Sequence, residues 1–224
     1  MKQIVAFFLV FIFNLMPASV WAYDLAPAVQ HIESEWARIH YSVAREQQDK
    51  EFKHLLSKVT DLQAQHPKQA EFIILQAIIV ASNAENVDAF SALEAIHEAK
   101  DLLVQAIELN PKALDGAAFV TLGTLYYMVP AWPVAYGDND KAQQLLEKAL
   151  AINANTIDAN FYYADFLVTQ GKQTQAIKYF NRALAVPVRA TQIFADTQLQ
   201  AQAKLAINQH GQEGNKQGFS LAAN

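Results

Sequence analysis

The side chains best suited to metal binding are six histidines, and their spacing does not form a metal site. A zinc site on one helix needs two histidines three or four residues apart, as in the His-Glu-x-x-His pattern. His31 and His40 are too far apart in sequence to lie on neighbouring helical turns. The chain has no cysteine, which excludes sites for soft metals as well. We therefore expect no metal and no cofactor, and we interpret the histidines as surface or groove-edge residues.

Asp138 and Asp140 resemble the start of a calcium-binding loop, but the rest of that pattern is missing. The loop needs a glycine at its sixth position and a bidentate glutamate at its twelfth. Those positions hold Gln143 and Ala149. We expect instead that Asp138 or Asp140 caps a helix that begins at Lys141.

Nucleophile-elbow, phosphate-loop and dinucleotide motifs are also missing from the sequence. The sequence therefore predicts a protein that is not an enzyme.

A loop rich in proline and aromatic residues precedes that helix, and residues 129–140 read VPAWPVAYGDND. Pro130 and Pro133 stiffen the backbone, which lowers the entropy cost of presenting Trp132 and Tyr136. Two interpretations of these aromatic side chains stay open. They either fill a neighbouring concave surface as a plug, or they contact a binding partner.

The loop interrupts a helical pattern that recurs along the chain. Residues 119–126 read FVTLGTLY, residues 142–149 read AQQLLEKA, and residues 160–183 repeat the pattern with a tighter connection. Small residues at these positions let paired helices approach closely, and Gly171 allows a left-handed turn between two of them. The residues expected to pack the repeats are Ala77, Ala99, Ala106, Gly123, Ala142, Ala149, Ala164, Gly171, Ala176, Phe180 and Ala183.

These patterns resemble the tetratricopeptide repeat superfamily. The residues that carry the resemblance are Phe119, Leu122, Gly123 and Tyr126 in one unit, and Ala164, Gly171, Ala176, Phe180 and Ala183 in the next. The resemblance implies an all-α fold, a right-handed solenoid of antiparallel helix pairs, whose concave face holds peptides or partner proteins. We expect clear repeats at 70–113, 116–156 and 157–188, a degenerate first pair at 27–67, and a capping helix at 190–208.

A narrower resemblance concerns the loop itself. Residues 129–138, followed by Lys141 and Ala142, are similar to the loop of periplasmic tetratricopeptide proteins related to the T component of tripartite ATP-independent periplasmic transporters. Those proteins associate with a substrate-binding protein and are often lipoproteins. This chain has no cysteine that could carry a lipid.

The tetratricopeptide register directs one set of side chains toward the concave face. That set is apolar and aromatic, includes carboxylates, and contains no lysine or arginine, which disfavours acidic peptides as ligands. The alternative is that these side chains are buried against a neighbouring helix or the loop. The candidate binding residues are Glu71, Ile74, Ile78, Val120, Thr124, Tyr127, Asp158, Phe161 and Asp165, together with Trp132 and Tyr136 of the loop.

Residues 1–22 have the pattern of a secretory signal peptide. Lys2 precedes an apolar run, and Val20 and Ala22 are the small residues that a signal peptidase requires. An uncleaved N-terminal anchor is the alternative. We expect a periplasmic or secreted protein that begins at Tyr23 and has no membrane span after cleavage.

The mature chain should form a single helical domain over 23–209, followed by a polar, disordered tail over 210–224. The full sequence has a formal net charge of −5 and no basic stripe, which argues against nucleic acid as a partner. Two functions stay open. The first is a non-catalytic scaffold that binds a protein or peptide in the envelope, as an accessory to solute uptake. The second is a carrier of a small apolar or cationic ligand, in a pocket between the helices and the 129–140 loop.

Overall fold

The computed structural model describes residues 25–221, and describes side chains as far as residue 210. The expected signal peptide at 1–22 lies outside the described residues. Within the described range all regular structure is helical, apart from one isolated bridge between Ala131 and Gly137. None of the helices in this range combines the length and the apolar character that a membrane span requires.

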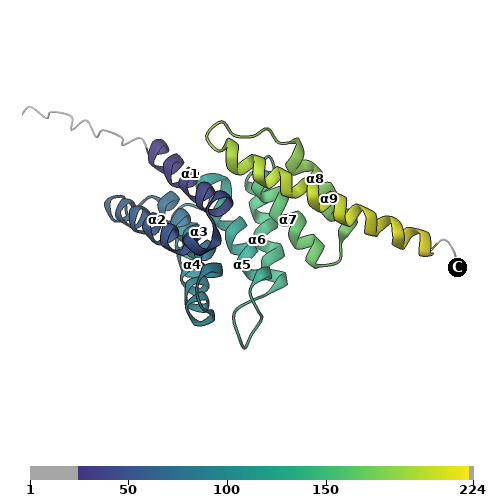
Figure 1. Cartoon of the computed structure of the whole chain (residues 1–224), viewed down its shortest axis with the longest axis horizontal. Helices are drawn as coiled ribbons and strands as arrows, with labels where there is room; N and C mark the ends of the chain where they lie inside the picture. The colour runs from purple at the N-terminus through teal and green to yellow at the C-terminus, as the bar shows by residue number, and fades with distance from the viewer. Residues whose placement is uncertain (1–24, 222–224) are drawn as a thin grey trace, which may run out of the picture.

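The described range contains nine α-helices, and consecutive helices pair from α1 to α8 (Figure 1). This arrangement confirms the predicted all-α solenoid. The helices are α1 (Ala26–Ser42), α2 (Arg45–Gln65), α3 (Ala70–Asn83), α4 (Ala89–Leu109), α5 (Ala117–Met128), α6 (Asn139–Ile152), α7 (Ile157–Thr169), α8 (Gln173–Ala185) and α9 (Ile193–Leu221). Two short 3-10 helices, η1 (Ala84–Asn86) and η2 (Ala113–Gly116), lie between α3 and α4 and between α4 and α5.

The odd-numbered helices form a continuous layer. Helices α1, α3, α5, α7 and α9 contact one another in chain order, and each even-numbered helix packs on the odd-numbered helices beside it in sequence. Helix α1 also contacts α9, so the odd-numbered layer closes into a ring. Figure 1 shows α9 passing beside α1 at its start and running along α8, with its C-terminal end extending past the array.

Polar caps and one glycine set several helix boundaries. The Asp88 side chain accepts hydrogen bonds from the backbone N–H groups of Phe90 and Ser91 at the start of α4. The Asp138 side chain accepts a hydrogen bond from the backbone N–H of Lys141 at the start of α6. Of the two predicted capping residues, Asp138 and Asp140, Asp138 is therefore the cap. Gly171 has a φ of 69°, which confirms the predicted left-handed turn between α7 and α8.

The C-terminal helix is longer than the sequence indicated. The capping helix was expected to end near residue 208 and to be followed by a disordered tail, whereas α9 continues to Leu221. This stretch has three glycines and no proline. A glycine inside a helix costs only about 1 kcal/mol relative to alanine, so it weakens a helix without ending it.

Gly123→Leu should lower the free energy of unfolding by about 1–3 kcal/mol, the usual cost of overpacking. A Cβ atom at Gly123 would lie 2.8 Å from Cγ of Leu146 and 3.3 Å from the carbonyl oxygen of Ala142. Leu146 is fully buried and cannot move aside freely. Gln144→Leu, which places the same side chain on the exposed face of α6, is the matched control. Coincident urea melts of the wild type and Gly123→Leu would show that α5 and α6 do not approach closely here.

Candidate functional site

The loop between α5 and α6 is closed at its base by short backbone contacts. The N–H of Gly137 donates to the carbonyl of Pro130 at 2.9 Å, and the N–H of Asp138 donates to the carbonyl of Tyr126 at 2.8 Å. A Cβ atom at Gly137 would lie 2.2 Å from the carbonyl oxygen of Val129, so only glycine fits at this crossing. Figure 1 shows the loop projecting beyond the ends of α5 and α6.

Tyr136 fastens this loop to α4. Its hydroxyl donates a hydrogen bond of 2.7 Å to the carbonyl of Ile96. Its ring makes edge contacts with Tyr126 and His97 at centroid distances of 5.3 and 5.1 Å, and Nζ of Lys100 lies 5.4 Å from its centroid. Burial raises the pKa of the Tyr136 phenol. Tyr136 therefore anchors the loop against α4 and against Tyr126 near the end of α5.

Trp132 lies in the same loop and has the opposite environment. Its side chain is 86% exposed, and the neighbouring Met128 and Val134 are 62% and 59% exposed. An open hollow of about 470 Å³ lies beside the loop, lined by residues 132–138 with His97 and Lys141. The plug interpretation is therefore wrong for Trp132, because a side chain this exposed does not fill a concave surface.

Tyr127 points away from the loop, toward α7. Consecutive helical residues diverge by about 100°, so Tyr126 meets Tyr136 while Tyr127 reaches the next unit. The Tyr127 hydroxyl donates a hydrogen bond of 2.7 Å to Oδ2 of Asp165. Burial raises the pKa of the Tyr127 phenol, and the Asp165 carboxylate raises it further. The structure thus brings together two residues that the sequence assigned to the concave face.

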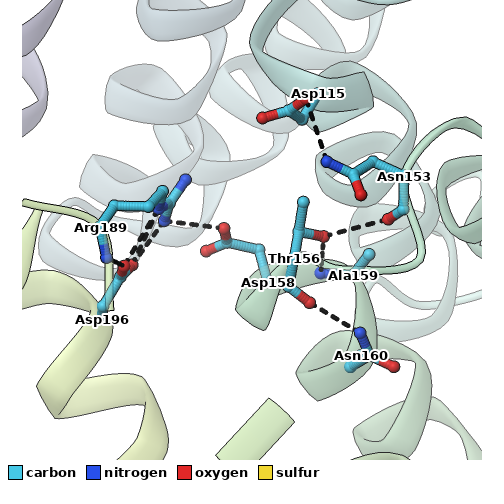
Figure 2. Close-up of polar contacts among 8 residues, drawn as sticks. All are labelled: Asp115, Asn153, Thr156, Asp158, Ala159, Asn160, Arg189 and Asp196. Carbon is cyan, nitrogen blue, oxygen red and sulfur yellow. Dashed lines mark hydrogen bonds and ion pairs between the residues drawn. The ribbon is translucent and has the colours of Figure 1, made fainter. Parts of the chain in front are cut away.

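Asp158, a third predicted residue, pairs with Arg189 from the segment between α8 and α9 (Figure 2). One guanidinium nitrogen, Nη2, lies 3.0 Å from Oδ2 of Asp158. The Nε–H and the backbone N–H of Arg189 both donate to the carboxylate of Asp196, at 3.1 and 2.7 Å from its Oδ2. Asp196 is fully buried at the start of α9. Arg189 therefore joins α7 to α9.

The start of α7 is held by a separate set of polar contacts, which fix the position of Asp158 (Figure 2). The Thr156 side chain accepts a hydrogen bond from a backbone N–H in the first turn of α7. The side-chain amide of Asn160 donates to the carbonyl of Thr156 at 2.7 Å, and that of Asn153 donates to Oδ1 of Asp115 at 3.2 Å. These contacts hold the start of α7 against the segment between α6 and α7. The Asp158 carboxylate takes no part in them and pairs with Arg189.

Several other residues assigned to the concave face lie in the core. Ile74, Val120 and Phe161 are 0, 5 and 8% exposed. Ile74 packs in the cluster between α3, α4 and α5, and Phe161 contacts the ring of Phe180 on α8. These side chains sit between helices and do not reach a ligand in this conformation. The remaining members of the set, which are partly exposed, are Glu71, Ile78 and Thr124.

Arg189 and Asp196 are the residues that sequence reasoning missed. They lie after residue 188, the predicted end of the last repeat, and neither belongs to a repeat position. One signal was available. Arg189 is the only cation between residues 183 and 203, and Asp196 lies in the first turn of the apolar helix that follows, where an acidic residue is favoured.

A family model and one solved structure support the same fold. Residues 134–203 match the family model of the tetratricopeptide repeat. The crystal structure of TTC0263, a thermophilic tetratricopeptide protein in Thermus thermophilus, is similar at a TM-score of 0.56 and 17% identity, covering 81% of this chain and 90% of that one. The family match is to residues 134–203, and the likeness to TTC0263 shows the fold of the array. The crystal structure of MamA matches at a TM-score of 0.43 and 14% identity, over 78% of this chain and 95% of that one. No curated protein matches the sequence.

Tetratricopeptide proteins in general are non-catalytic and serve as scaffolds for protein–protein interaction. In this array the connection within the α5–α6 unit is the unusual part. The α7–α8 unit turns through Gly171 in three residues, 170–172, whereas α5 and α6 are joined by residues 129–138. The candidate site therefore has two separate parts, the exposed loop around Trp132 and the carboxylates on the odd-numbered helices.

Proposed function

We propose that this chain is a non-catalytic periplasmic or secreted scaffold that binds a protein partner through the loop at 129–138. The tetratricopeptide fold supports the scaffold role, and the signal-peptide pattern of residues 1–22 supports the location. The likeness of the loop to periplasmic proteins related to a transporter component supports a role as an accessory to solute uptake. The partner would then be another protein of that uptake system.

One observation carries the proposal: Trp132 is 86% exposed on a loop whose backbone is fixed on both sides. The loop is anchored by Tyr136 on α4 and closed by Gly137 over Val129 and Pro130. Presenting a large aromatic side chain on a rigid support keeps the entropy cost of binding low. Tryptophan is also among the residues where binding free energy concentrates at interfaces. A solvent-exposed tryptophan held in this way is a contact for a partner.

The partner can be identified by photo-crosslinking in the source cells. A photoreactive phenylalanine analogue at position 132 should give one dominant crosslinked product. The matched control is the same analogue at Phe90, an aromatic residue of α4 that is 70% exposed and lies outside the loop. Equal product patterns from positions 132 and 90 would mean that the loop has no specific partner.

The alternative function, a carrier of a small ligand, rests on the hollow beside the loop. Its volume of about 470 Å³ is within the usual range of ligand sites, roughly 300–1,000 Å³. The hollow is open and is formed largely by the loop itself, which suits a protein surface better than an enclosed ligand. If position 132 crosslinks to no protein while a small molecule raises the melting temperature, the carrier function replaces the scaffold.

A further inference from the structure

Met128 is the last residue of α5 and lies at the base of the loop that presents Trp132. The sequence has three methionines and no cysteine. Met1 and Met16 lie in the predicted signal peptide, so cleavage after Ala22 would leave Met128 as the only sulfur atom of the mature chain. Any sulfur oxidation of the mature chain would then take place at this one side chain.

The Met128 side chain is open to small reagents. The two residues before it make internal contacts: the ring of Tyr126 meets the ring of Tyr136, and the hydroxyl of Tyr127 binds Asp165. Met128 follows them at the end of the helix and is 62% exposed. A thioether that is in contact with water is also reached by dissolved peroxide, which converts methionine to methionine sulfoxide.

Met128 also belongs to the apolar surface around Trp132. Residues 128–137 contain no charged side chain, and Met128, Trp132 and Val134 are its exposed large apolar residues. Four residues separate Met128 from Trp132, so their Cα atoms lie at most about 14 Å apart. A protein partner covers about 800 Å² on each side of an interface, which corresponds to a disc of about 16 Å radius. A partner centred on Trp132 therefore reaches Met128.

Oxidation would change the character of this surface without adding a charge. Methionine sulfoxide replaces a flexible apolar side chain with a polar one. A polar group that an interface buries without a hydrogen-bond partner loses its contact with water and opposes binding. The expected loss of affinity is about tenfold, which corresponds to a single such group. Because Met128 is exposed in the free protein, the helices should stay folded.

We propose, on the basis of the binding function proposed above, that Met128 is an oxidation site at which peroxide weakens the partner's hold on the Trp132 loop. The sulfur gives two electrons to a peroxide: the peroxide O–O bond breaks, an S–O bond forms, and water leaves when the oxidant is hydrogen peroxide. A dithiol reductant reverses the step, since it becomes a disulfide while the sulfoxide oxygen leaves as water.

The test compares the exported protein before and after treatment with hydrogen peroxide, which is removed before any partner is added. Peptide mass spectrometry should find one added oxygen atom at Met128, and circular dichroism should find unchanged helix content. Affinity for the partner recovered at position 132 should fall by about tenfold. Methionine sulfoxide reductase with a dithiol should restore it.

Two variants show whether Met128 is responsible. Met128→Leu keeps an apolar side chain of similar volume, so it should bind as the wild type does and keep its affinity through the same treatment. Met128→Gln places a polar side chain at this exposed position and should bind about tenfold more weakly without any peroxide. Both variants keep Trp132, so they also report any damage to the tryptophan.

Wild-type affinity in a protein that is fully oxidised at Met128 would overturn the oxidation site. An equal loss in treated Met128→Leu would overturn it too, because another residue would then be the target, as would a loss of helix content on oxidation. Failure of the untreated wild type to bind the partner recovered at position 132 is a different result. It would overturn the binding function itself, and the role of Met128 with it.

Discussion

Asp196→Ala should lower the free energy of unfolding by about 3 kcal/mol, the low end of the cost of breaking a buried ion pair. The Asp196 carboxylate is fully buried and accepts hydrogen bonds from the backbone N–H and the guanidinium of Arg189. Removing it leaves Arg189 with Asp158 as its ion-pair partner and with partial exposure to water, which limits the loss. Urea denaturation is the suitable measurement, because guanidinium would compete for the same carboxylates.

A surface carboxylate provides the control for that experiment. Glu35 pairs with Arg38 at 3.2 Å in an exposed setting, so Glu35→Ala should cost less than about 1 kcal/mol. Equal losses for Asp196→Ala and Glu35→Ala would show that the Arg189 contacts do not hold α9 in place.

Gly137→Val should weaken partner binding by about tenfold or more, as loss of a fixed loop geometry does, although Trp132 stays in the sequence. The Cβ atom would overlap the carbonyl oxygen of Val129 and lie 2.9 Å from Pro130, so the loop must move and draw Tyr136 from its place on α4. The measurement is affinity for the partner recovered from position 132, alongside circular dichroism to confirm unchanged helix content. Ala131→Val, which places the same side chain at an exposed position of the loop, is the matched control.

That outcome separates two roles for the loop. If its rigidity matters, Gly137→Val loses affinity and Ala131→Val loses less. Wild-type affinity in Gly137→Val would mean that a flexible loop binds equally well, and that the anchor at Tyr136 serves stability alone.

The fold could be predicted from the sequence because small residues report close helix contacts directly. Gly123 lies where a Cβ atom would meet Leu146, and Gly171 has the positive φ that its place in the pattern required. The cap at Asp138 followed from the same kind of local rule. In each case the signal and its structural cause lie within one repeat, so a single sequence contains all of the information.

The candidate site could be predicted only in part, because its contacts depend on elements far apart in the chain. Helical spacing shows which residues share a face but not what covers that face, so buried Ile74 and Phe161 looked the same as Asp158. Arg189 reaches Asp158 from a connecting segment that has no periodicity. Trp132 and Tyr136 are both aromatic residues of one proline-rich loop, so the sequence does not distinguish their roles. The loop closure at Gly137 leaves Trp132 exposed and places Tyr136 against α4.

The most direct test of the scaffold proposal is to measure affinity for the crosslinked partner and melting temperature on the same Trp132→Ala protein. Truncating an interface tryptophan typically costs about 2 kcal/mol or more, so affinity should fall by roughly thirtyfold. The melting temperature should stay at the wild-type value, because the side chain is 86% exposed and supports no packing. Phe90→Ala, at an aromatic residue that is 70% exposed, should change neither quantity. Wild-type affinity in Trp132→Ala would contradict the proposal that this loop is the binding site.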